Sequence, residues 1–143
     1  MALDAVQLMG MAQEQLDDLF KKSPAGPIPD GPAKGTAIIV PGTVMSREIA
    51  EIINIFAWQG KTFDSKHGVL TNKVSVLGFN AIVAEVYKGE SWLDQKECIV
   101  LDYSKTSLLA HYIRDEIREV APKLYLGKVY WGKKRLIDFC LEF

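Results

Sequence analysis

The sequence predicts an α+β fold, in which an antiparallel meander of about six or seven strands is strongly curved or closed into a barrel and accompanied by three helices. Three observations predict it. After Trp58-Gln59-Gly60, apolar residues mostly alternate with polar ones, which is typical of half-buried strands. The connections between these runs are short, so consecutive strands should pair antiparallel. Other segments carry apolar residues at the three-and-four spacing of a helix.

The first element is an amphipathic helix over residues 4–21, within an N-terminal helical segment of residues 1–22. Its apolar residues fall on one face, with Gln and Asp opposite. Residues 23–35 contain four prolines and three glycines. Such a segment cannot continue a helix, so it forms an irregular connection. A short strand is expected over Thr36–Val40, ended by Pro41-Gly42.

Ser46 can cap a second helix, near residues 46–57, whose isoleucines share one face. Three strands and a third helix are predicted to follow, and the chain ends in a hairpin turned at Gly132-Lys133. The strands are Val69–Leu77, Phe79–Lys88 and Lys96–Tyr103, the helix covers residues 106–120, and the hairpin strands are Leu124–Trp131 and Lys134–Phe143. Residues 1–143 are expected to form a single domain, with the barrel over 36–143.

The last strand shows which of its faces is buried. Arg135, Ile137, Phe139, Leu141 and Phe143 alternate with Leu136, Asp138, Cys140 and Glu142. A meander with one aromatic face must either pack on helices or close on itself to bury that face and its edges. A small barrel with helices covering an open end is therefore the preferred architecture.

Composition excludes several classes of protein. The chain has 143 residues, 17 Lys plus Arg against 18 Asp plus Glu, and a net charge of −1, so it lacks the basic excess of a nucleic-acid binder. No apolar run approaches the roughly 18 residues of a membrane span. The N-terminus lacks the pattern of a signal peptide, so we expect a cytoplasmic protein.

Cys98 and Cys140 both lie in strand-like runs. Reduced, buried thiols are favoured in that compartment, while a disulfide between adjacent strands stays open as an alternative. Neither cysteine belongs to a CxxC or histidine cluster, so no metal is predicted. The sequence contains no GxSxG, HExxH, P-loop or GxGxxG motif, and no cofactor is predicted.

Aromatic and polar residues on the strand faces predict that the barrel binds a hydrophobic small molecule, such as a fatty acyl or isoprenoid compound. The alternative is that these aromatic rings only fill the core and that the inward polar groups bond to backbone. The residues expected to line the cavity, with Asn72 or Arg135 at the polar end of the ligand, are Trp58, Asn72, Phe79, Tyr87, Tyr103, Tyr130, Arg135 and Phe139.

A second hypothesis is a cofactor-independent isomerase, cyclase or lyase that acts on such a ligand. Its candidate catalytic residues are Glu85, Asp102, Tyr103 and His111. On the predicted third helix His111 and Asp115 are four residues apart and can meet, although this face lies opposite the apolar stripe, where a solvated charged network is the favoured explanation. A third hypothesis is a protein-interaction module, which predicts an exposed apolar patch and an oligomer such as a homodimer.

The run Ala57-Trp58-Gln59-Gly60-Lys61-Thr62-Phe63-Asp64 resembles the W-x-G-K-x-F-[DN] core of small bacterial GXWXG-type proteins. A strand with Asn72, a strand ending in Val86-Tyr87 and a closing F-x-L strand follow in a similar order. The C-terminal tail from Tyr125 resembles lipocalin-like, or calycin-like, barrels. The chain departs from the family pattern at Phe56, where the family has glycine. The resemblance implies a barrel able to hold a hydrophobic small molecule, without specifying any chemistry.

Overall fold

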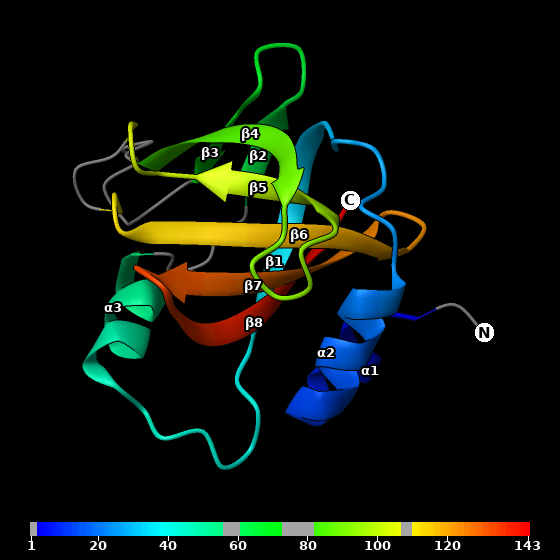
Figure 1. Cartoon of the computed structure of the whole chain (residues 1–143), viewed down its shortest axis with the longest axis vertical. Helices are drawn as coiled ribbons and strands as arrows, with labels where there is room; N and C mark the ends of the chain where they lie inside the picture. The colour runs from blue at the N-terminus through cyan, green and yellow to red at the C-terminus, as the bar shows by residue number, and fades with distance from the viewer. Residues whose placement is uncertain (1–2, 56–60, 73–81, 107–109) are drawn as a thin grey trace.

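In a computed structural model, which describes residues 3–55, 61–72, 82–106 and 110–143, the chain forms a closed antiparallel barrel (Figure 1). Within these residues there are three helices and eight strands. The helices are α1 (Ala5–Met9), α2 (Gln13–Lys22) and α3 (Arg47–Ile55). The strands are β1 (Gly31–Ile38), β2 (Lys61–Asp64), β3 (Val69–Asn72), β4 (Ile82–Glu90), β5 (Glu97–Asp102), β6 (Ile113–Ala121), β7 (Leu124–Trp131) and β8 (Lys134–Glu142).

The first and last strands close the barrel. Each strand pairs with the next in the chain, and β1 pairs with both β2 and β8, for example at Gly31 with Phe63 and at Gly35 with Leu141. Among the described strands, each one therefore has a partner on both sides. The prediction of a closed antiparallel meander is therefore confirmed, with a slightly higher strand count than expected.

The predicted N-terminal helix over residues 4–21 is wrong in one respect, because the segment forms two helices. The Gly10 N–H donates to the Gln7 carbonyl and the Met11 N–H to the Leu8 carbonyl, which ends α1, and α2 begins at Gln13. The buried side chains of both helices, which include Leu8, Leu16 and Phe20, pack on the outside of the barrel wall. Figure 1 shows α1 and α2 together on one side of the barrel.

The predicted helix over residues 106–120 is wrong, because residues 113–121 form strand β6. Ile113 and Ile117 are four residues apart, a spacing that suits a helix face and a strand face equally. The strand also places Asp115 between them, on the inner face, and Arg114 on the outer face. Pairing with both β5 and β7 decides in favour of the strand.

Two other boundaries differ from the sequence prediction. The first strand begins at Gly31 rather than Thr36, and it accommodates Pro32 as its second residue. Proline is tolerated near the start of a strand, where the lost N–H is least needed. The four-residue strand β2, which the sequence analysis did not identify, follows α3. Of the predicted strands, residues 73–81 lie outside the described residues.

The second helix and the C-terminal hairpin are confirmed. The Ser46 hydroxyl accepts a hydrogen bond from the Ile49 N–H at 3.1 Å, which caps α3. Strands β7 and β8 meet at a turn where Gly132 adopts φ of +60°, a conformation that favours glycine. Ile49 and Ile52 join the apolar cluster inside the barrel, so α3 covers one end of it.

The barrel wall is apolar on both faces. One buried cluster fills the interior, and a second lies between the outer wall and the helices α1 and α2. Cys98 and Cys140 belong to the outer cluster as free thiols, which confirms the reduced state; burial raises the pKa of Cys98 to about 12 and of Cys140 to about 11. None of the helices within the described residues is long and apolar enough to cross a membrane.

Candidate functional site

A charged cluster lies inside the barrel, near the end that α3 covers. Lys61 is the first residue of β2, Tyr103 directly follows β5, and Asp115 is the third residue of β6. Because alternate strands run in opposite directions, these three positions meet at the same end of the barrel. All three side chains are almost completely buried.

Register shows that these side chains point inward. Asp115 pairs with Leu101 on one neighbouring strand and with Val129 on the other, and Lys61 pairs with Ala33. All three partners belong to the interior apolar cluster, and cross-strand partners share a face of the sheet. The cluster is thus a polar island in an otherwise apolar interior.

The three polar groups contact one another. The Lys61 ammonium Nζ donates a hydrogen bond to the Tyr103 hydroxyl at 3.0 Å, and that hydroxyl donates to Asp115 Oδ2 at 3.4 Å. Nζ lies 3.7 Å from the same carboxylate oxygen. The other oxygen, Asp115 Oδ1, is buried and accepts no hydrogen bond from any described residue.

Burial shifts both charged groups toward their neutral forms. Removal from water lowers the pKa of Lys61 from 10.5 to about 8, although Asp115 attracts the ammonium. In the same way burial raises the pKa of Asp115 from 3.8 to about 6, although Lys61 and the Tyr103 hydrogen bond favour its charge. Desolvation therefore exceeds the attraction between the two groups. Chemically, such a cluster can hold a ligand oxygen, move a proton or present an amine.

The sequence-predicted residues divide between the two faces of the wall. Tyr103 and Phe139 lie in the interior cluster as expected, and the Lys61 Nζ lies 5.6 Å from the Phe139 ring centroid. Trp58 and Phe79 lie outside the described residues, and for Asn72 the structure describes the backbone alone.

Three of the predicted residues lie in one row on the outer face: Glu85, Asp102 and Tyr130. Arg114, which was not predicted as a site residue, lies between Asp102 and Tyr130 in that row. Glu85 pairs with Asp102, Asp102 with Arg114, and Arg114 with Tyr130. The Tyr130 ring packs edge-on against Trp92 at 5.1 Å, outside the barrel. The expectation that Glu85 and Asp102 converge with Tyr103 is therefore not met, because alternation along the strands places them on the opposite face.

The remaining candidates also lie outside the interior. Tyr87 donates a hydrogen bond to Asp102 at 2.8 Å, and Arg135 forms an ion pair with Asp17 of α2 at 3.0 Å. His111 lies exposed in the turn before β6. Because the segment is not a helix, the expected meeting of His111 with Asp115 does not occur.

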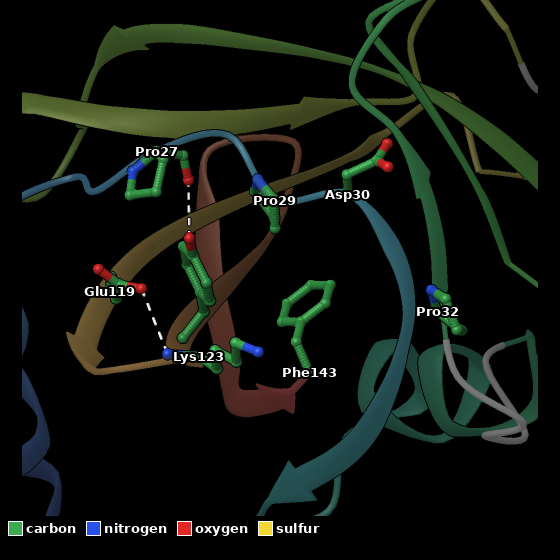
Figure 2. A pocket seen from close by; sticks show the side chains of 8 residues that line it. Pro27, Pro29, Asp30, Pro32, Glu119, Lys123 and Phe143 are labelled. Carbon is green, nitrogen blue, oxygen red and sulfur yellow. Dashed lines mark hydrogen bonds between the residues drawn. The ribbon is translucent and has the colours of Figure 1, made fainter.

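Two surface pockets are further candidate sites. The first, of about 470 Å³, lies at the end of the barrel opposite α3, where Pro27, Pro29 and Asp30 form one side and Glu119, Lys123 and Phe143 another (Figure 2). The Tyr125 hydroxyl beneath it donates to the Pro27 carbonyl at 2.7 Å. The second, of about 340 Å³ on the outer wall, is lined by residues that include Asp102, His111, Trp92 and Arg114.

Sequence reasoning missed Lys61 and did not place Asp115 in the interior. A signal for Lys61 was present, since Lys61 and Phe63 alternate with Thr62 and Asp64 in a strand pattern and Phe63 is plainly apolar. For Asp115 the equivalent signal was the alternation with Ile113 and Ile117.

Comparison with known proteins supports the fold. No family model matches the chain, and no curated protein matches it. Among solved structures, the chain is similar to a protein from Thermomonospora curvata, with a TM-score of 0.63 and 16% sequence identity over 92% of this chain and 87% of that one. At this identity the likeness shows the fold alone.

Proposed function

We propose that the barrel binds one small, mostly apolar molecule and that Lys61, Tyr103 and Asp115 hold its polar end. The observation that carries this proposal is the buried Asp115 Oδ1, which accepts no hydrogen bond from the described residues although it belongs to a charged cluster. Buried polar atoms are almost always satisfied, so an unsatisfied one calls for an explanation. A ligand hydroxyl that donates to this oxygen provides one.

The energetics of the cluster support a functional role. Both pKa values move toward the neutral forms, so the buried pair does not stabilise the fold relative to apolar side chains of similar size. Groups of this kind are concentrated at functional sites. The interior of an eight-stranded barrel is wide enough either to be filled by side chains or to hold one small ligand.

The charge of the site favours a neutral ligand. Lys61 and Asp115 already balance, so a ligand carboxylate or ammonium would add an uncompensated charge to a buried, apolar region. A neutral hydroxyl or carbonyl oxygen can instead accept from Lys61 or Tyr103, and a hydroxyl can also donate to Asp115. We therefore expect a fatty acyl or isoprenoid compound that carries a hydroxyl or carbonyl group.

The resemblance to lipocalin-like barrels and GXWXG-type proteins also supports this proposal, because it implies a barrel able to hold a hydrophobic small molecule. In the segment that carries the likeness, Lys61 and Phe63 form the inward face of β2. An alternative place for the same ligand is the pocket in Figure 2, where prolines and the rings of Tyr125 and Phe143 offer an apolar surface. Variants at the two ends of the barrel distinguish these places.

The test is a binding titration of 1-decanol, 2-decanone and decanoate by calorimetry, preceded by native mass spectrometry of the purified protein. We expect the neutral probes to bind at least tenfold more tightly than decanoate. Lys61→Met and Asp115→Asn should weaken binding of 1-decanol at least tenfold, while Phe143→Ala should change it less than threefold.

The chain offers matched controls for both variants. Lys128 and Asp138 also form a buried lysine–aspartate pair with one unpartnered carboxylate oxygen, but they lie on the outer wall under α2. Lys128→Met and Asp138→Asn should therefore lower stability without changing binding. The proposal is wrong if no probe binds below about 1 mM and no carried ligand is found, or if the interior and outer variants affect binding equally.

A further inference from the structure

We propose that Lys61 is a nucleophile that forms an imine with a carbonyl group of the bound molecule, so that aldehydes and ketones are the ligand or substrate class of this barrel. This inference rests on the function proposed above and adds a covalent step to it. It also gives Tyr103 and Asp115 separate roles, as proton carrier and as counter-ion of the product.

The geometry around Lys61 is the first support. Its Nζ lies within hydrogen-bond distance of the Tyr103 hydroxyl, at 3.0 Å, and Asp115 Oδ2 lies within reach of both groups. An amine, a phenol and a carboxylate thus lie together among the apolar residues of the barrel interior. This arrangement places a proton donor and a proton acceptor directly beside the nucleophilic nitrogen.

Comparison with the outer lysine shows that this environment is not simply that of any buried lysine. The Lys128 ammonium lies 2.6 Å from an oxygen of Asp17 and 2.7 Å from one of Asp138, so two close carboxylates hold its charge. The Lys61 Nζ lies 3.7 Å from its nearest oxygen of Asp115. Asp115 thus holds the Lys61 ammonium less closely than Asp17 and Asp138 hold that of Lys128, which agrees with the lowered pKa of Lys61, about 8.

The covalent step balances without any further reactant. The lone pair of the neutral Lys61 amine attacks the carbonyl carbon, and the carbonyl oxygen takes a proton from the Tyr103 hydroxyl. The nitrogen gives up one proton to the tyrosine oxygen, which restores the hydroxyl. Asp115 holds the proton that Lys61 released on becoming neutral and passes it to the hydroxyl of the carbinolamine, the C–O bond breaks and one water leaves. The carbonyl compound and the amine become an iminium and water, with Asp115 as the counter-ion.

The iminium carbon is open to attack by water, and the fold protects it. Lys61 is 1% exposed, and α3 covers the end of the barrel at which it lies. Exclusion of water favours the imine over its hydrolysis products. An iminium also withdraws electrons from the adjacent carbon, so the same site could support proton abstraction next to the former carbonyl by Asp115 or Tyr103.

The test incubates the full chain with decanal or 2-decanone and sodium cyanoborohydride at pH 7, then maps the reduced adduct by peptide mass spectrometry. We expect one dominant adduct, on Lys61, formed at least tenfold faster than adducts on exposed lysines such as Lys133. Tyr103→Phe should slow trapping at least tenfold even when the carbonyl probe is at a saturating concentration, because the proton carrier is lost. Trapping on Lys61 should rise as pH is raised from 6 to 8.

The outcomes separate this inference from the proposed function. If 1-decanol binds but the adducts are spread over exposed lysines and Lys61 stays unmodified, the imine is wrong and the binding function stands. If neither the alcohol nor the carbonyl probes bind, both are wrong. Lys61→Arg keeps the positive charge but cannot form an imine, so it should retain a folded barrel and lose the adduct; mapping the unaltered protein decides the matter even where a variant does not fold.

Discussion

The variants Lys61→Met and Asp115→Asn, which each remove one partner of the interior ion pair, should differ in how their stability depends on pH. The free energy of unfolding should fall with rising pH in the first variant and rise with pH in the second. Lys61→Met leaves the Asp115 carboxylate buried without its cation, and Asp115→Asn leaves the Lys61 ammonium buried without its anion. Each variant then carries one uncompensated buried charge, which typically costs about 3–5 kcal/mol when the group stays ionised. Each group can avoid that cost by becoming neutral, but the two do so in opposite directions of pH.

The pKa shifts of Lys61 and Asp115 in the unaltered protein indicate how large these effects on the free energy of unfolding should be. The Lys61 pKa falls from 10.5 to about 8, and the Asp115 pKa rises from 3.8 to about 6. Because each tenfold change in proton affinity corresponds to about 1.4 kcal/mol, each charged group lowers the free energy of unfolding by about 3 kcal/mol even with its partner present. Without the partner the penalty for each charge is larger.

The signs follow from proton linkage. In Lys61→Met the folded-state pKa of Asp115 rises further above its unfolded value, so the folded state binds more protons and stability increases as pH falls from 8 to 5. In Asp115→Asn the folded-state pKa of Lys61 falls further below its unfolded value, so stability increases as pH rises from 7 to 9.5. Between about pH 6 and 8 these two groups give the unaltered protein little pH dependence.

Urea unfolding followed by tryptophan fluorescence at pH 5, 7 and 9 measures these free energies. At pH 7 each single variant should lose about 2–4 kcal/mol, and the double variant Lys61→Met/Asp115→Asn should lose less than the sum of the two. The expected slopes have opposite signs in the two single variants. Slopes of the same sign, or single losses below 1 kcal/mol, would refute the view that Lys61 and Asp115 are desolvated partners.

Three further predictions concern the barrel wall. Gly127→Ala should destabilise the fold by about 2–3 kcal/mol, because a Cβ there would lie 2.3 Å from the Phe139 ring, and adding Phe139→Leu should recover part of that loss in urea unfolding. Arg118→Lys should cost about 2–4 kcal/mol, since the guanidinium donates hydrogen bonds through all three of its nitrogens and an ammonium has only three N–H groups; a loss below 1 kcal/mol would contradict this. Cys98 and Cys140 should stay unreactive toward a thiol reagent at pH 8 until denaturant is added, and rapid labelling of the folded protein would show that the outer cluster opens.

The sequence predicts correctly those strands in which apolar and polar residues alternate in a pattern that no helix would give. The run Arg135 to Phe143 alternates too regularly for a helix, and its predicted inward face is correct at Ile137, Phe139 and Leu141. It is wrong at Arg135, which lies on the outer wall beyond a register shift between β7 and β8. The run from Ile113 was assigned to a helix because its isoleucines are four residues apart, a spacing common to both periods. The segment forms a strand because it pairs with β5 and β7, and this tertiary pairing outweighs its local preference for helix or strand.

The site was harder to predict than the fold, because this barrel has two apolar faces. In most small barrels a charged residue that alternates with apolar ones points out to water, and the apolar ones point in. Here helices α1 and α2 also cover part of the outer wall, so alternation shows that two faces differ without showing which is inside.

The pairs Lys61–Asp115 and Lys128–Asp138 show why the sequence does not reveal which face of the wall is inside. Both join a lysine and an aspartate on strands, both are buried, and both leave one carboxylate oxygen without a partner among the described residues. The outer pair fixes α2 to the wall through Asp17, and so its position follows from packing. The interior pair joins strands that already pair with their neighbours through the backbone, so it adds no connection that closure of the barrel lacks. Packing alone therefore does not account for the interior pair, and this is the reason for our proposal that the pair binds a ligand.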